Sequence, residues 1–229
     1  MRHVKLAAIA ACFGACIACN AASAEGTAGA IRLGTLGIGA DADFRLTEQL
    51  NLRVGYSAFN YSDTLSSSDV DYDGDAKLRT ATALVDWHPG GHGFRVTFGA
   101  IGSNTKVDVR AKPSNNTFEF NGQTFTASEV GTVRGNVKPG NSFGPYVGIG
   151  WGNPFGSTGR ATFLFDLGVI YMGSPDVDLT ATCGSAAPTG SAECAQLQNA
   201  VVQEERDLQD DADIYEWYPV ASVGIAVKF

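Results

Sequence analysis

Charged residues occur at alternate positions inside segments that are otherwise apolar or rich in glycine. Asp41 and Asp43, for example, alternate with Ala40, Ala42 and Phe44. Successive side chains of a strand point to opposite faces, so the charges share one face and the apolar groups share the other. Five acids and four bases occupy such polar faces: Asp41, Asp43, Arg45, Arg53, Asp86, Arg95, Asp166, Glu216 and Lys228. Side chains of these types, brought together away from water, form ion pairs or bind small charged molecules.

Two cysteines have the spacing of a local disulfide. Cys183 and Cys194 have ten residues between them, whereas Cys12, Cys16 and Cys19 fall in a segment with the features of an export leader. Exported proteins fold in an oxidising compartment, where an even pair of cysteines forms a bridge. We therefore predict that Cys183 and Cys194 are bonded to each other.

The end of the chain indicates which element positions these groups. Val223, Ile225, Val227 and Phe229 share one face of an extended segment, and the residues between them share the other. An alternating strand that ends the chain on an aromatic residue is typical of the closing strand of a bacterial outer-membrane β-barrel. Barrel-assembly machinery recognises such a C-terminal strand. We therefore expect this machinery to be a partner of the protein, through the strand that ends at Phe229.

Seven further segments alternate in the same way. The apolar phase changes between the first two, and we place a tight reversal at Gly34-Thr35 rather than a bulge, because bacterial barrels have an even number of strands. The sequence therefore predicts an all-β fold, an eight-stranded antiparallel transmembrane β-barrel in the bacterial outer membrane. The seven segments are residues 28–33, 36–46, 50–58, 77–87, 94–105, 144–151 and 160–171.

Long and short connections alternate along the chain. Residues 62–75, 106–143 and 173–212 form the long ones, which we expect to be a polar loop, a structured loop and a loop with a helix. Asn121-Gly122 predicts a small hairpin in the second, and helical spacing predicts a helix over 192–210 in the third. Long extracellular loops and short periplasmic turns are typical of transmembrane barrels. The periplasmic rim would then carry five aromatic residues: Phe44, Trp87, Phe94, Trp151 and Phe229.

The first residues have the features of a signal peptide. Basic residues precede an apolar run, 6–18, and Ala22-Ser23-Ala24 is a small-residue cleavage site. A lipobox at Ile9-Ala10-Ala11-Cys12 is the alternative, but too few apolar residues precede it. We expect residues 1–24 to be removed and residues 25–229 to form the barrel.

Neither a metal site nor catalysis is predicted. His88 and His92 are separated by Pro-Gly-Gly, which prevents the helix that would bring both rings to one metal ion. Residues 69–75 begin like a calcium loop, but Thr80 stands where the closing carboxylate belongs. Barrel enzymes of the outer membrane generally place a catalytic histidine at the outer rim, whereas both histidines lie in a predicted periplasmic turn. We therefore expect no enzyme activity, no metal and no cofactor.

The charge balance excludes one class of partner. Without the two basic residues of the leader, 14 basic residues stand against 24 acidic ones, which disfavours nucleic acid. Acids in the long connections 62–75 and 173–212 would concentrate cationic solutes at a pore entrance, or hold divalent cations that bridge lipopolysaccharide. Outer-membrane lipid and lipopolysaccharide are expected partners in either case.

Two interpretations of the inward charges stay open. The interior of an eight-stranded barrel is just wide enough for side chains to fill, so the charges either pair as a structural network or line a narrow polar path. Inward glycines would leave free space for such a path. We expect a barrel that admits small, preferably cationic solutes, with a non-conducting structural or surface-interaction barrel as the alternative. These glycines are at positions 37, 39, 55, 99, 148, 150, 168 and 224.

The second half of the chain resembles the CarO-type outer-membrane proteins, which are described as ornithine-uptake porins. The resemblance is carried by Pro145-Tyr146-x-Gly148-x-Gly150, by Gly168-x-x-Tyr171-x-Gly173-x-Pro175-x-Val177-x-Leu179 and by Tyr215-Glu216-Trp217-x-Pro219-Val220. Gly34-Thr35-x-Gly37-x-Gly39 is a weaker match near the front. The resemblance implies an eight-stranded barrel, passage of basic amino acids, and entry of some β-lactam antibiotics. The cysteine pair is not part of that pattern.

Overall fold

Eight antiparallel strands close into a barrel, as the alternation predicts. The computed structural model describes residues 26–66, 71–112, 117–156 and 158–229, so the predicted leader lies outside the described residues. Each strand pairs with the next, and the last pairs with the first, which leaves no free edge in the barrel. The strands are β1 (Thr27–Gly34), β2 (Gly37–Arg45), β3 (Leu50–Ser66), β4 (Asp71–Trp87), β5 (Phe94–Ser103), β10 (Phe143–Trp151), β11 (Ala161–Tyr171) and β13 (Trp217–Lys228).

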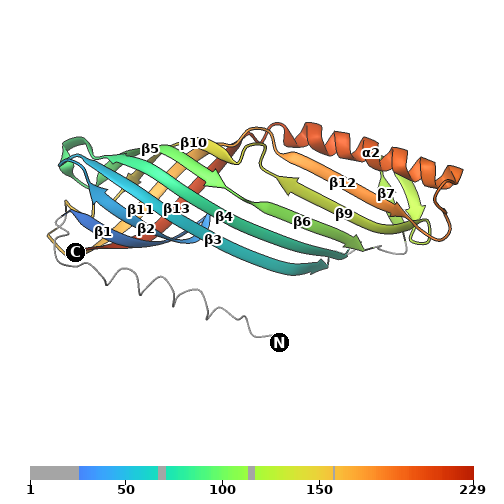
Figure 1. Ribbon diagram of the computed structural model, residues 1–229, viewed down its shortest axis with the longest axis horizontal. Helices are drawn as coiled ribbons and strands as arrows, with labels where there is room; N and C mark the ends of the chain where they lie inside the picture. The colour runs from blue at the N-terminus through green and yellow to red at the C-terminus, as the bar shows by residue number, and fades with distance from the viewer. Residues whose placement is uncertain (1–25, 67–70, 113–116, 157) are drawn as a thin grey trace, which may run out of the picture.

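The reversal between β1 and β2 confirms the even strand number. Gly34 pairs with Gly37 across a two-residue turn, and Ile31 of β1 lies opposite both Ala40 of β2 and Ile225 of β13. The C terminus lies beside the start of β1, at the end of the barrel where the β2–β3, β4–β5 and β10–β11 connections turn (Figure 1). The phase change in the sequence is therefore a turn and not a bulge.

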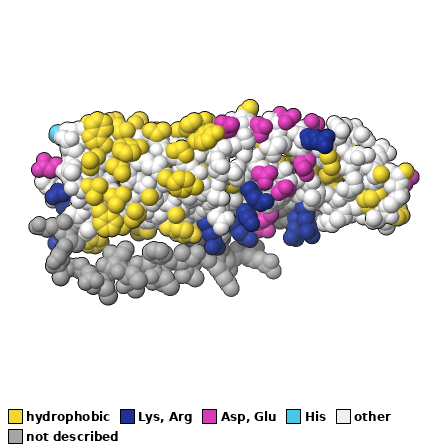
Figure 2. Space-filling view, turned by 45° about the horizontal axis from the view of Figure 1, so that its top comes forward, with side chains coloured by type: hydrophobic (Ala, Val, Ile, Leu, Met, Phe, Trp, Pro, Cys, Tyr) yellow, Lys and Arg dark blue, Asp and Glu magenta, His cyan; other side chains and the backbone are white. Residues whose placement is uncertain are grey.

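The outward side chains form an apolar band around the barrel (Figure 2). Ile31, Phe163 and Trp151 are each more than 60% exposed, which is unfavourable in water and favourable against lipid. No helix in the described part of the chain is both long enough and apolar enough to cross a membrane. All five aromatic residues of the predicted rim are exposed: Phe44, Trp87, Phe94, Trp151 and Phe229.

The barrel continues at one end into a second sheet, here called the outer extension (Figure 1). β4 leaves β5 at Thr80 and pairs from Lys77 outward with β6 (Lys106–Lys112). The strands β9 (Val130–Lys138) and β12 (Asp176–Cys183) complete this sheet beside β6. The prediction of a polar loop at residues 62–75 was therefore wrong in its described part. The β3–β4 ladder continues there because backbone pairing does not require apolar side chains on a face that is open to water.

The two connections 106–143 and 173–212 hold more strand than the sequence indicated. The predicted hairpin is confirmed as β7 (Thr117–Phe120) and β8 (Gln123–Thr126), with Asn121 and Gly122 both at positive φ. The predicted helix is confirmed as α2 (Ala192–Ala212), which begins with Ser191 as N-cap. The strands β6, β9 and β12 were missed.

Helix α2 packs against the outer extension along its length. Its buried residues join the hairpin and the sheet in one apolar core, made of Phe118, Phe120, Phe125, Val130, Val133, Ala181, Leu197, Ala200 and Val201. Beside this apolar face of α2, three polar side chains form hydrogen bonds with the backbone of the edge strand β12 or of the residues just before β12. Gln198 donates to Ala181 O (2.7 Å), Glu205 accepts from Leu179 N (2.9 Å), and Gln209 both accepts from Val177 N and donates to Pro175 O. The helix thus occupies a sheet edge that would otherwise be open to pairing with another chain.

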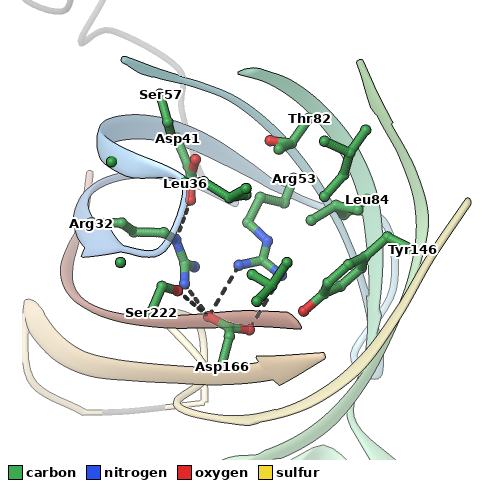
Figure 3. Close-up of a pocket in the computed structure, with 14 residues that line it drawn as sticks. Arg32, Leu36, Asp41, Arg53, Ser57, Thr82, Leu84, Tyr146, Asp166 and Ser222 are labelled. Carbon is green, nitrogen blue, oxygen red and sulfur yellow. Dashed lines mark hydrogen bonds and ion pairs between the residues drawn. The ribbon is translucent and has the colours of Figure 1, made fainter. Parts of the chain in front are cut away.

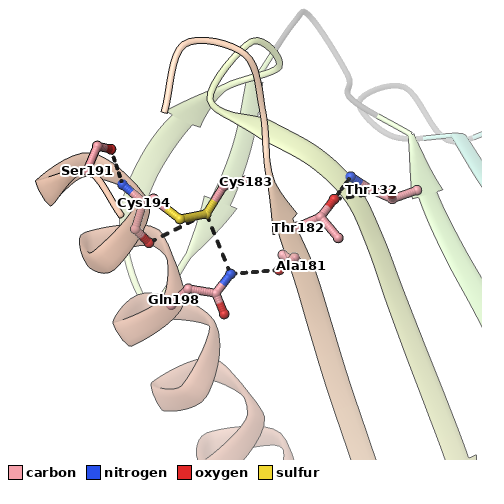
Figure 4. The surroundings of a disulfide bond; sticks show 7 residues. All are labelled: Thr132, Ala181, Thr182, Cys183, Ser191, Cys194 and Gln198. Carbon is pink, nitrogen blue, oxygen red and sulfur yellow. Dashed lines mark hydrogen bonds between the residues drawn. A yellow bond between two sulfur atoms is a disulfide. The ribbon is translucent and has the colours of Figure 1, made fainter. Parts of the chain in front are cut away.

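A disulfide fastens the start of α2 to the end of β12. The structure joins Cys183 to Cys194, whose Cα atoms are 5.6 Å apart, and Gln198 lies beside the bridge (Figure 4). A bridge between residues so close in sequence stabilises mainly by restricting a short loop in the unfolded chain.

Removing the bridge is expected to loosen α2. Replacing both cysteines with serine should destabilise the outer extension by about 2–3 kcal/mol, because the loop that the bridge closes is short. The measurement is the rate of limited proteolysis within residues 184–212, compared between the variant and the wild-type protein. Mass spectrometry of the wild-type protein without its leader, taken before any reduction, should find no free thiol. Two thiols that can be alkylated without reduction would contradict the disulfide between Cys183 and Cys194.

Candidate functional site

Three arginines and three aspartates meet inside the barrel. Arg32 comes from β1, Arg53 from β3 and Arg95 from β5, and their side chains are less than a tenth exposed. Each lies at an inward position because its neighbours along the strand point to lipid. The aspartates come from β2, β4 and β11, and are Asp41, Asp86 and Asp166.

Asp166 is the centre of this ion-pair network. It accepts from Arg32 Nη1 and from Arg53 Nη1 at 3.4 Å (Figure 3). It also accepts from Arg95 Nη2 at 2.8 Å. Ser222 lies 3.5 Å from the same carboxylate. One carboxylate therefore neutralises parts of three guanidinium groups from three different strands.

The two other aspartates complete the network. Asp86 accepts from Arg53 Nη2 at 2.9 Å and from Thr97 Oγ1 at 2.5 Å, and Asp41 accepts from Arg32 Nε. Each of the three arginines of the network thus contacts at least one carboxylate, because a charge buried in this low-dielectric interior requires a partner of opposite charge.

A fourth aspartate gives the lumen an excess of negative charge. Asp43 is 2% exposed, and its Oδ2 has no hydrogen-bond partner among the described residues. Arg32 Nη2 and Arg53 Nε are buried without a partner in the same sense. The buried lumen therefore holds four carboxylates and three guanidinium groups, and three polar atoms of these groups have no hydrogen-bond partner among the described residues.

A small cavity adjoins the network on its outer side. Its volume is about 50 Å³, and its polar lining includes Arg32, Asp41, Ser57, Tyr146 and Asp166 (Figure 3). A space of this size holds one or two water molecules. It is too small for an amino acid.

The inward glycines do not leave open space, so that expectation was wrong: a Cβ at any of the eight positions would lie within 2.8 Å of another atom. A Cβ on Gly168 would lie 2.6 Å from Tyr146 Cζ, and one on Gly150 would lie 2.9 Å from Arg95 Nε. The small residues admit the tyrosine ring and the guanidinium group into the lumen. The glycines therefore allow larger side chains to fill the lumen, and they do not line an open channel.

Packed residues lie at both ends of the lumen. At the outer end lies an apolar layer formed by Leu84, Ile101, Tyr146, Ile170, Met172 and Val220, with Leu36 packed against it. At the inner end the turn after β10 folds inward, so that Gly152 accepts from Arg95 Nη1 and Asn153 lies 3.4 Å from Asn51. His88 is buried beside this turn, and burial lowers the pKa of its ring, which is therefore neutral at pH 7.

The structure brings together six of the nine inward charges that the alternation selected. Arg45 is instead exposed at the inner rim, with its guanidinium 5.8 Å from the centre of the Phe155 ring. Glu216 is half-buried just before β13 begins, and its backbone oxygen accepts from Met172 N. Lys228 is half-buried at the end of β13. These three lie at strand ends, where the inward direction leads to the rim and not to the centre. The six that meet are Asp41, Asp43, Arg53, Asp86, Arg95 and Asp166.

One member of the network was missed. Arg32 stands between Ile31 and Leu33, and the same alternation places it inward. Tyr146 was identified only as part of a motif. Because Val147, the next residue, points outward, the alternation already places Tyr146 inward. No group of three or more His, Cys, Asp or Glu side chains in the described part of the chain is arranged to hold a metal ion.

Comparison with known proteins supports this fold. No family model matches the chain, and no curated protein matches it. The crystal structure of Acinetobacter baumannii CarO2 matches with 25% sequence identity and a TM-score of 0.63, over 91% of this chain and 100% of that one. The crystal structure of Acinetobacter baumannii CarO matches with 24% identity and a TM-score of 0.62, over 89% of this chain and 98% of that one. The resemblance that the motifs suggested is thus confirmed along nearly the whole chain.

Proposed function

We propose that this chain, being a CarO-type outer-membrane β-barrel, lies in the bacterial outer membrane and admits small cationic solutes through its lumen. The observation that carries the proposal is the excess of carboxylates over guanidinium groups in the buried lumen, where one Asp43 oxygen has no partner in the described part of the chain. An entering cation can pair with the carboxylate that exceeds the guanidinium groups, so the three arginines keep their partners during passage. An entering anion would add to the excess.

Passage requires that the outer apolar layer moves. Met172, which belongs to this layer, and Leu36, which packs against it, lie in the connections that follow β11 and β1 and not in the barrel strands. Connections open at a lower free energy than paired strands, so these two residues are the natural gate. Basic amino acids, whose ammonium groups can bond to the aspartates, are the solutes that fit this chemistry.

A second candidate function is a non-conducting barrel that supports the outer extension. The filled glycine positions and the small cavity favour it. In that case the network stabilises the lumen, and the extension carries the contacts of the protein.

Conductance separates the two candidates. The refolded mature protein is placed in a planar phosphatidylcholine bilayer, and reversal potentials are taken in ornithine and glutamate salts. Discrete cation-selective openings are expected. Silence from a barrel whose gel mobility still shifts on heating, and which is therefore folded, would favour the non-conducting candidate.

Asp43→Asn is expected to reduce the preference for cations about 5- to 30-fold. The reason is that one charge at roughly 10 Å in a medium of intermediate dielectric contributes about 1–2 kcal/mol. The ratio of cation to anion permeability measures this change. Asp207→Asn on the exposed side of α2 is the matched control and should leave the ratio unchanged. Equal selectivity in the Asp43 variant and the wild type would remove Asp43 from the proposed path.

A further inference from the structure

Basic side chains stand directly opposite one another on the water-facing side of the outer extension. Lys77 of β4 pairs with Lys106 of β6, and all three of Lys77, Arg79 and Lys106 are exposed. Like charges directly opposite on neighbouring strands repel each other. We name Lys77, Arg79 and Lys106 the basic row.

The basic row lies on the same face of β4 as the lipid-facing residues. Ala81, Ala83 and Trp87 follow Lys77 and Arg79 at even spacing, and β4 runs unbroken between them. Ten residues separate Lys77 from Trp87 at the inner rim, which is about 33 Å along a strand and about 25 Å along the axis of a barrel with the usual tilt. That length equals the usual height of the apolar band, so the row stands at its outer edge.

The arrangement of charges in space agrees with this estimate. Figure 2 shows Lys and Arg side chains gathered beside the apolar band, at the end nearest the outer extension. Farther out on this face, two exposed acids have partners of their own. Lys138 pairs with Asp178 at 3.2 Å, and Asp108 accepts from Asn136 at 2.6 Å.

We propose that the basic row binds a phosphate group of an outer-leaflet glycolipid, such as the phosphorylated disaccharide of lipid A. A phosphate between the ammonium groups of Lys77 and Lys106 relieves their repulsion, and Arg79 can donate two parallel hydrogen bonds to it. The level of the row identifies the source, because a lipid phosphate is held at the edge of the apolar band whereas free phosphate is not. The proposal depends on the location in the outer membrane, and not on solute passage.

The test compares lipid A with its dephosphorylated form. The refolded protein is titrated with each lipid in detergent micelles, and the bound lipid is counted by native mass spectrometry. Lipid A with both phosphates is expected to bind at least tenfold more tightly than the form without phosphate. The variant Lys77→Gln, Arg79→Gln, Lys106→Gln should lose this preference.

A charge-matched variant controls for a general effect of basic residues. Arg110→Gln, Arg134→Gln, Arg206→Gln removes three positive charges that lie farther from the apolar band or on α2, and should keep the tenfold preference. Equal preference in the two variants would overturn the proposal, as would equal binding of the two lipids by the wild type. Complete competition by millimolar inorganic phosphate would overturn the assignment to a lipid. The conductance experiment uses a bilayer without lipid A, so the failure of one proposal does not imply the failure of the other.

Discussion

Replacing Asp166 with asparagine is expected to destabilise the barrel by about 3–5 kcal/mol. The carboxylate contacts Arg32, Arg53 and Arg95, and the side chains of all four are less than a tenth exposed. Asparagine keeps the shape but removes the charge, so three buried guanidinium groups then share only the remaining aspartates. Removing one partner of a buried ion pair costs this much because the other charge stays in a medium that does not solvate it.

Urea unfolding of the protein in detergent, followed by the gel mobility of unheated samples, measures the change. The control is Asp178→Asn, which removes a carboxylate from the half-exposed pair with Lys138 and should cost less than about 1 kcal/mol. If both variants unfold at the same urea concentration, the network does not contribute to the stability of the barrel.

Replacing Leu197 with alanine is expected to destabilise the outer extension by about 2–5 kcal/mol. Leu197 is fully buried in the core that α2 shares with the β7–β8 hairpin and β9. The cost includes the lost burial and the cavity that alanine leaves. Because this core contains no residue of the closed barrel strands, the urea midpoint of the barrel should not change.

Hydrogen exchange of the amides of α2, measured by mass spectrometry, reports on the extension alone. Leu208→Ala is the matched control, since Leu208 lies on the same helix but is 41% exposed, and it should change exchange little. Faster exchange in both variants would mean that helix propensity, and not the buried core, holds α2 in place.

The barrel could be predicted from the sequence because each strand carries its own signal. Alternation fixes which residues face lipid, and the even strand number resolved the ambiguity at Gly34-Thr35. The strands β6, β9 and β12 were not predicted because one face of the extension is charged and open to water. Asp108 and Arg110 of β6 are examples, and a polar alternating segment in a long connection resembles a loop.

The network could be predicted only in part. Alternation gives the direction of each side chain, so Asp86, Arg95 and Asp166 were identified correctly as inward. Which of them meet depends on how strands are displaced along one another, and Arg32 and Asp166, 134 residues apart, come together only in the closed barrel. The space beside the glycines could not be predicted, because the side chain that fills it, Tyr146, lies on the same strand as Gly148 and beside the strand of Gly168.

Because β1 pairs with β13, the barrel can close only after the last strand is present. Seven residue pairs join the first strand to the last, and Phe229 N donates to Thr27 O at 3.1 Å. The first strand therefore keeps one unpaired side until β13 has been synthesised and reaches it, and contacts so far apart in sequence form slowly. Folding by such distant contacts is slow and exposes a strand edge to aggregation. A delay of this kind gives a physical reason for the predicted dependence on assembly machinery, which would hold the two ends until they meet.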